Sequence, residues 1–373
     1  MAGLYIHIPF CKQKCTYCDF HFSTTFSAYR EKMIHSIVKE LESRVAYLGK
    51  QKVSTLYFGG GTPSLLSKEE LKLIVDTVYQ NYRIESEIEF TLEANPDDIS
   101  IEQLLMWKNA GVNRLSIGLQ SFLQEDLDWM NRAHTAEESE SAVRLAKEHG
   151  FSLTVDLIYG LPNRTKFDWE YNIEKLVKLG PDHISAYCLT VEKQTALHKL
   201  IEKGELPEVS EDNQSDQFEL LISKMKSSGY QQYEISNFAK EEAYSKHNSN
   251  YWKGIHYLGI GPSAHSFDGE SRRWNVANNP KYIKGITENT IYYEEEILTP
   301  KDRFNELLLT GLRTKWGVNL ESLSFKHCPS KEFYKQLESF KEFDLIIEEE
   351  GRIILTEKGK LQADHIAAML FLE

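Results

Sequence analysis

Short runs of β-branched and aromatic residues alternate with longer amphipathic stretches over about the first 235 residues of the chain. The short runs have the length of buried strands, whereas apolar residues recur every three or four positions in the longer stretches, as on one helix face. This alternation is typical of βα units around a parallel sheet. The six strand candidates are Leu4–Ile8, Val53–Phe58, Glu87–Glu93, Arg114–Gln120, Leu153–Ile158 and His183–Leu189.

Helix start signals support this division of the chain. Ser67 with Glu70, and Ser100 with Gln103, fit the capping box, in which two side chains satisfy free N–H groups at a helix N-terminus. Six βα units suffice for a partial barrel. We therefore predict an α/β fold in which residues 1–235 form a TIM-like partial (βα)6 barrel.

The pattern breaks after residue 235. Residues 236–298 are loop-like and aromatic and include the acidic run Glu294-Glu295-Glu296, so we expect a connecting region there. Thr299-Pro300 opens a predicted helix, because Pro suits the first helical position and Asp302 can complete a cap on Thr299.

The C-terminal residues 299–373 predict a smaller α+β domain. Helices precede a hairpin with its turn at Gly351, and a last helix is expected from about Gly359 to Phe371. This order resembles a winged helix. Such modules often bind DNA, but these residues hold 11 Lys and Arg against 13 Asp and Glu, so we favour packing or partner docking over DNA binding.

The charge of the whole chain narrows the choice of partners and compartment. The formal net charge is -13, which argues against a broad phosphate-binding surface. No apolar run approaches the roughly 18 residues of a membrane helix, and the start of the chain lacks the apolar core of a signal peptide. We expect a cytoplasmic protein with no nucleic-acid partner and no integral membrane segment.

Three of the five cysteines, Cys11, Cys15 and Cys18, form a C-x3-C-x2-C motif directly after the first predicted strand. This spacing indicates metal binding rather than disulfides, and we expect Cys188 and Cys328 to be buried thiols without a direct role. Three thiolates can ligate three irons of a [4Fe-4S] cluster and leave the fourth iron open. The alternative is a zinc site, which would need a fourth ligand such as His21.

Further motifs follow the predicted strands. They are Tyr5-Ile-His-Ile-Pro-Phe-Cys11, Gly59-Gly60-Gly61-Thr62-Pro63, Glu93-Ala-Asn-Pro96, Gly118-Leu-Gln-Ser-Phe122, Met130-Asn-Arg-Ala-His-Thr135 and Asp156-Leu-Ile-Tyr-Gly-Leu-Pro162. With the cysteines, they resemble the radical S-adenosylmethionine (SAM) superfamily over essentially the whole chain. The similar branch contains oxygen-independent coproporphyrinogen III oxidase and the haem chaperone HemW.

This resemblance implies that SAM chelates the open iron and can be cleaved to a 5′-deoxyadenosyl radical, while the protein orients the cofactors. An electron donor for the cluster is then also implied. The residues that match the SAM site are Tyr5, Gly60, Gly61, Thr62, Glu93, Gln120, Arg132 and Asp156.

The chemistry of these residue types agrees with that assignment. Glycines after the second strand let the backbone approach a ligand closely. Glu93 and Asp156 can accept hydrogen bonds from the SAM amine or ribose, and Arg132 can pair with a carboxylate. The structural alternatives are a plain turn at the glycines and salt bridges from the two acids to Arg132 or Arg114. We assign no catalytic residue.

Two departures separate this chain from the oxidase. The oxidase motif continues to a fourth cysteine, but Phe20 stands at that position here, and only ten residues precede Cys11, where the oxidase has a long extension. The sequence His247-Asn248-Ser249-Asn250-Tyr251-Trp252 instead resembles the H-N-x-x-Y-W motif of the chaperone branch.

A neutral imidazole can ligate haem iron, and neighbouring Tyr and Trp can cover the macrocycle. The alternative is that His247 and Asn248 cap a loop while Tyr251 and Trp252 fill a core. The resemblance implies a haem chaperone that binds haem through His247 and passes it to an acceptor protein. The oxidase reaction, or another radical SAM reaction, is the alternative function.

Overall fold

The computed structural model describes residues 1–326 and 329–372, so Cys328 lies outside the described residues. Six parallel strands run side by side in chain order, and each corresponds to a predicted strand with small differences at the ends. They are β1 (Ala2–Ile8), β2 (Val53–Gly60), β3 (Ile84–Ala94), β4 (Arg114–Gln120), β5 (Ser152–Tyr159) and β6 (His183–Cys188). The predicted α/β partial barrel is confirmed.

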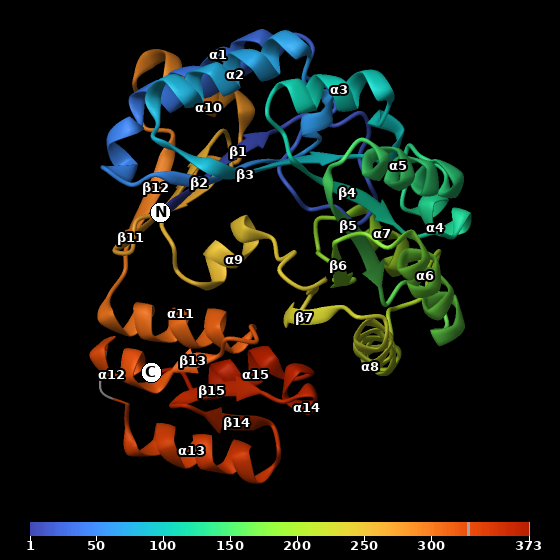
Figure 1. Ribbon diagram of the computed structural model, residues 1–373, viewed down its shortest axis with the longest axis vertical. Coiled ribbons are helices and arrows are strands. Elements are labelled where there is room, and N and C mark those ends of the chain that lie inside the picture. The colour runs from blue at the N-terminus through green and yellow to red at the C-terminus, as the bar shows by residue number, and fades with distance from the viewer. Residues whose placement is uncertain (327–328, 373) are drawn as a thin grey trace.

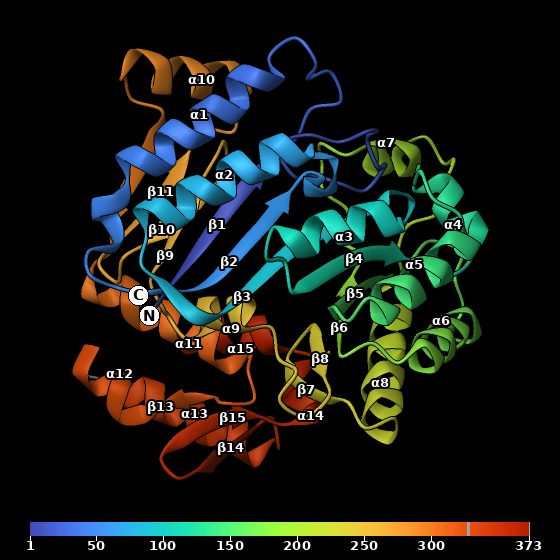
Figure 2. The ribbon, with the colours of Figure 1, turned by 45° about the horizontal axis from the view of Figure 1, so that its top comes forward.

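Helices connect these strands and cover one face of the sheet (Figure 2). They are α1 (Arg30–Ser43), α2 (Lys68–Asn81), α3 (Ile101–Asn109), α4 (Gln124–Trp129), α5 (Ala136–Glu148), α6 (Lys166–Leu179) and α8 (Glu211–Ser227). The short helix α7 (Ala196–Glu202) follows β6 and lies beside the cysteine loop, where the Leu197 N–H donates to the Thr16 carbonyl. The capping box of Ser67 and Glu70 is confirmed. Ser100 accepts the hydrogen bond from the Gln103 N–H, as predicted, without a reciprocal bond from the Gln103 side chain. Short 3-10 helices span Val45–Leu48, Pro63–Leu65 and Pro96–Asp98.

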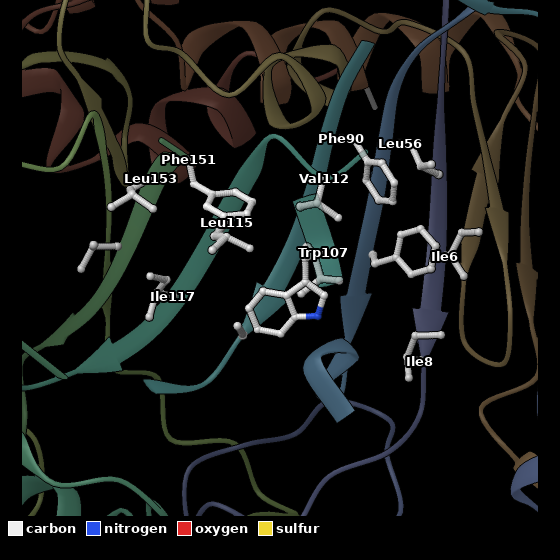
Figure 3. Packing of buried hydrophobic residues seen from close by; sticks show 14 of the residues in the cluster. Ile6, Ile8, Leu56, Phe90, Trp107, Val112, Leu115, Ile117, Phe151 and Leu153 are labelled. Atoms are coloured by element: carbon white, nitrogen blue, oxygen red, sulfur yellow. The ribbon is translucent and has the colours of Figure 1, made fainter. Parts of the chain in front are cut away.

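Alternation along the strands divides the sheet into an apolar and a polar face. Leu4, Ile6 and Ile8 of β1 are fully buried, and the matching positions of β2 to β5 are apolar as well. These side chains pack between strands and helices around Trp107 of α3 (Figure 3). The intervening positions, among them Tyr57, Ser116 and Asp156, line a cavity on the other face. The strands therefore carry a core on one side and a site on the other.

The region expected as a connection, 236–298, instead extends the sheet at both edges. At one edge β9 (Tyr257–Ile260) pairs parallel with β1, and β10 (His265–Phe267), β11 (Ser271–Asn275) and β12 (Tyr293–Ile297) follow antiparallel. At the other edge β8 (Asn237–Ala239) pairs antiparallel with β6, and β7 (Gln231–Glu234) with β8. The loop-like expectation is wrong, although the proposed domain boundaries at 235 and 298 stay predictions.

Two helices of the same region have different places in the fold. The helix α10 (Asn279–Glu288) packs against α1, where the Glu40 carboxylate accepts a hydrogen bond from the Tyr282 hydroxyl at 2.7 Å. The helix α9 (Lys246–Trp252) lies between the parallel strands and the C-terminal part (Figure 1).

The C-terminal part has the winged-helix order of elements and its own apolar core. Its elements are α11 (Pro300–Leu312), β13 (Val318–Asn319), α12 (Leu320–Lys326), α13 (Lys331–Glu342), β14 (Ile346–Glu349), β15 (Arg352–Leu355), α14 (Glu357–Lys360) and α15 (Ala363–Met369). The cap of Thr299 and Asp302 is present, and Gly351 turns the hairpin with φ of 73°. The last helix differs from the prediction, because two short helices replace it. Within the described ranges, no helix is long and apolar enough to cross a membrane.

Candidate SAM and iron–sulfur site

A cavity of about 500 Å³ opens at the carboxyl ends of the parallel strands, where barrels of this type bind ligands. Most of the predicted site residues contribute to its wall, although they come from six different strands or loops. The predicted residues that line it are Cys11, Cys15, Cys18, Gly60, Gly61, Thr62, Glu93, Gln120, Arg132 and Asp156. Tyr5 does not line it. Its hydroxyl instead lies 3.2 Å from Nδ1 of His7, beneath the cavity wall.

The three motif cysteines lie on the loop after β1, where all three are half-buried and free of disulfide bonds. Hydrogen bonds reach two of the sulfurs, from Thr62 Oγ1 to Cys11 at 3.4 Å and from Arg132 Nη1 to Cys15 at 3.5 Å. Burial raises the pKa of Cys11 to about 12 and that of Cys18 to about 11. Binding of iron therefore has to displace thiol protons.

The zinc alternative loses its candidate fourth ligand. His21 Nε2 forms a 2.8 Å hydrogen bond with Asn279 Oδ1, and its ring stacks on His7. Among the described residues, no His, Cys, Asp and Glu side chains form a compact group for a single ion. Three thiols spread along one loop fit the three-thiolate ligand set of a [4Fe-4S] cluster.

The glycines at the end of β2 lie too close to β1 and the cysteine loop to carry a side chain. A Cβ on Gly60, whose φ is 106°, would lie 2.5 Å from the His7 ring. A Cβ on Gly61 would lie 2.6 Å from the carbonyl oxygen of Phe10, next to Cys11. Close approach of these glycines to a ligand stays a prediction. Their nearest neighbours within the protein belong to β1 and to the loop that carries the cysteines.

Glu93 and Asp156 face the cavity and form no ion pair with any residue that the structure describes. Glu93 accepts hydrogen bonds from the Tyr57 hydroxyl at 2.8 Å and the Gly60 N–H at 3.1 Å, and Ser116 donates to Asp156 at 3.2 Å. Desolvation raises the pKa of Glu93 to about 7 and that of Asp156 to about 6. Two carboxylates without a cationic partner suit a cationic ligand, and SAM carries a sulfonium and an ammonium group.

The salt bridges considered for these acids are not found in the described part of the chain. Arg114 donates to Thr154, while Arg132 donates through Nη2 to Asn95 Oδ1 at 2.7 Å and to the Gly118 carbonyl at 2.8 Å. The buried Nε atom of Arg132 has no partner among the described residues. The salt-bridge alternative is therefore wrong, and the residues fit SAM and the cluster.

The structure places His247 differently from the prediction. The side chain is buried, its Nδ1 lies 2.8 Å from Thr55 Oγ1, and its Nε2 lies 2.9 Å from the Tyr251 hydroxyl. Both ring nitrogens are engaged, so neither is available to an iron atom in this conformation. The arrangement agrees with the alternative in which the motif fills a core.

Several residues of the cavity wall were missed. They include Tyr57, Ser116, Ser185, Tyr187 and Asn248. Four of them alternate with apolar residues on predicted strands, so the period of two could have identified them. Cys188 is exposed at the cavity wall, so the expectation of a buried thiol is wrong.

The fold and this site define a radical SAM protein. Residues 5–176 match the Radical SAM superfamily, and residues 298–361 match the HemN C-terminal domain. The radical SAM enzyme HemN from Escherichia coli, a coproporphyrinogen III oxidase, shares the fold with a TM-score of 0.87 over 99% of this chain and 90% of that one, at 24% identity.

Curated relatives narrow the family. The heme chaperone HemW of Bacillus subtilis is 36% identical over 98% of both chains, and that of Haemophilus influenzae is 34% identical over 100% of this chain and 98% of its own. HemW of Escherichia coli is 36% identical over 75% of this chain and 74% of its own. The chain belongs to the HemW family of radical SAM proteins.

Proposed function

We propose that the protein is a haem chaperone that binds haem and passes it to an acceptor protein. The observation that carries this proposal is the 36% identity to a heme chaperone over 98% of both chains. A [4Fe-4S] cluster on Cys11, Cys15 and Cys18, with SAM beside it, accompanies this role. SAM contact by Gly60, Gly61, Thr62, Glu93, Gln120, Arg132 and Asp156 is part of the proposal, as are an electron donor and a cytoplasmic location.

The charges of the cavity disfavour the oxidase alternative. The charged residues of the cavity wall are Lys12, Arg132, Asp19, Glu93, Asp156 and Glu192. Lys12 already pairs with Asp97 and Asp98, and the Arg132 guanidinium already donates to neighbouring groups. Of these six wall residues, four are acids and the two cations already have partners, which does not favour a porphyrinogen with several propionate carboxylates. Haem also carries propionates, so we place its contact surface outside this cavity.

His247 stays the proposed axial ligand of haem, under one condition set by its neighbours. Thr55 or Tyr251 must give up its hydrogen bond before a ring nitrogen can reach an iron atom. A neutral ring is available for this, because burial lowers the pKa of His247 to about 3.

The test is haem titration of the anaerobically reconstituted protein, followed by its Soret band. We expect saturation at a single haem per chain, a changed spectrum in His247→Ala, and retained haem binding when the three motif cysteines are replaced by Ala. Turnover of coproporphyrinogen III without haem binding would favour the oxidase. Formation of 5′-deoxyadenosine only with a non-porphyrin substrate would favour another radical SAM reaction.

A further inference from the structure

The helix α9 contributes a residue to the cavity wall. Asn248 is part of the cavity wall, while the neighbouring His247 packs against β1 and β2, with Cε1 3.4 Å from the position of a Cβ on Gly3. Glu89 on β3 fixes the start of the helix, because its carboxylate accepts the N–H groups of Lys246 at 2.9 Å and His247 at 2.8 Å. The helix is thereby tied to the strand that carries Glu93.

A short series of contacts leads from α9 to the Glu93 carboxylate. The imidazole of His247 stacks on the Tyr57 ring, with centroids 4.8 Å apart and an interplanar angle of 26°. The hydroxyl of Tyr57 donates to Oε1 of Glu93 at 2.8 Å, and the Gly60 N–H donates to Oε2. One carboxylate oxygen is therefore held by a ring whose own position depends on His247.

We propose that α9 is part of the SAM site: His247 and Tyr57 are positioning residues for Glu93, and Asn248 contributes an amide to the ligand surface. The inference rests on the proposed function only in taking SAM as the occupant of the cavity. It assigns the H-N-x-x-Y-W segment a role beside the predicted haem contact. A carboxylate held in one orientation binds its partner better than one that must be ordered on binding.

Four substitutions at three residues separate the parts of this arrangement. Tyr57→Phe keeps the stacked ring and removes only the hydrogen bond to Glu93, and Asn248→Ala removes the amide from the cavity. His247→Ala removes the ring beneath Tyr57, whereas His247→Phe restores a stacked ring without a metal-binding nitrogen. Lys246→Ala is the matched control, because this exposed side chain belongs to the same helix.

The measurement is the SAM dissociation constant of each reconstituted variant by equilibrium dialysis, together with iron content and the SAM-induced change in the EPR spectrum of the reduced cluster. We expect Tyr57→Phe and Asn248→Ala to bind SAM about tenfold more weakly, or about 1.4 kcal/mol, at unchanged iron content. His247→Ala should weaken SAM binding similarly, and His247→Phe should restore most of it.

SAM affinity within twofold of wild type in both Tyr57→Phe and Asn248→Ala overturns the inference, and these two variants decide the test if His247→Ala does not fold. Haem titration of the same proteins keeps this result distinct from the proposed function. If the variants bind haem more weakly but bind SAM as the wild type does, the chaperone role is supported and the inference is rejected. If the wild type binds no haem but the variants bind SAM more weakly than it does, the inference is supported and the chaperone role is rejected.

Discussion

Arg132 lies between the cysteine loop and the end of β3, where its Nη2 donates to Asn95 Oδ1 at 2.7 Å. Nη1 of the same guanidinium lies 3.5 Å from Cys15 Sγ, and Asn95 in turn lies 3.5 Å from Thr62 Oγ1, which donates to Cys11. Two of the three sulfurs are thus connected through one arginine, one asparagine and one threonine. The positive charge stands beside sulfurs that become thiolates when iron binds.

The first prediction concerns the reduction potential of the cluster in Arg132→Gln. Removing a positive charge and a hydrogen bond near Cys15 disfavours the reduced, more negative cluster, so the potential should fall. EPR-monitored redox titration measures this shift. Arg132→Lys is the control, since it keeps the charge and should retain most of the wild-type potential. A potential equal to wild type in Arg132→Gln would show that the guanidinium does not act on the cluster.

The second prediction is that Gly61→Ala disturbs cluster assembly. A Cβ at this position would lie 2.6 Å from the Phe10 oxygen and 2.8 Å from the Ile8 oxygen, both rigid backbone atoms. The loop that carries Cys11 must therefore move, and we expect a several-fold loss of iron per chain after reconstitution. In the control Gly118→Ala, the nearest atom is the flexible Gln120 amide. Equal iron content in both variants would contradict the prediction.

The parallel strands could be predicted because their pattern is local. In Arg114–Gln120, apolar Leu115, Ile117 and Leu119 alternate with residues of the other face, and the predicted bounds agree with β4. The same alternation marks Ser116 and Gln120 as neighbours in the cavity. Motif and periodicity therefore determine most of the cluster and SAM site.

The strands at the sheet edge depend on distant partners. The acidic β12 pairs with β11 so that Glu296 lies opposite Arg272 and Glu295 opposite Arg273, a match that no local pattern reveals. One of the two partners of His247 is equally remote, since Thr55 precedes it by 192 residues. Spacing alone could not show that the imidazole would find two hydrogen bonds in the interior.

The third prediction follows from the pKa of Glu93, which desolvation raises from 4.5 to about 7. The folded state favours the protonated acid, so its stabilising contribution is complete below the unfolded pKa and is lost as the pH rises through about 7. In the cluster-free protein, the stability of Glu93→Gln should not show this decrease with rising pH, because Gln does not ionise. A pKa difference of one unit corresponds to about 1.4 kcal/mol. The difference in free energy of unfolding between wild type and Glu93→Gln should therefore change by at least ~1 kcal/mol between pH 5 and 8.

Thermal unfolding across this pH range measures the divergence. Glu87→Gln on the exposed part of the same strand is the matched control and should follow the wild type. Parallel curves for wild type and Glu93→Gln would mean that Glu93 ionises freely in the folded protein.

The last prediction concerns Glu40, a fully buried carboxylate that joins α1 to the sheet edge. It accepts hydrogen bonds from the Gly261 N–H at 2.9 Å, Asn275 Nδ2 at 2.9 Å and the Tyr282 hydroxyl at 2.7 Å, and Arg44 lies 3.5 Å away. The three hydrogen-bond donors Gly261, Asn275 and Tyr282 come from the region expected to be a connection, so Glu40 helps to explain why that region folds onto the barrel.

Replacing Glu40 with Ala leaves several buried donors and the Arg44 charge without their acceptor. Breaking a buried pair by removal of one partner costs roughly 3–5 kcal/mol, so Glu40→Ala should lower the free energy of unfolding by about that amount. Denaturant unfolding at neutral pH gives the value. Glu42→Ala, exposed on the same helix, should change it by no more than ~0.5 kcal/mol. If both variants unfold at the same denaturant concentration, the Glu40 network does not stabilise this edge of the sheet.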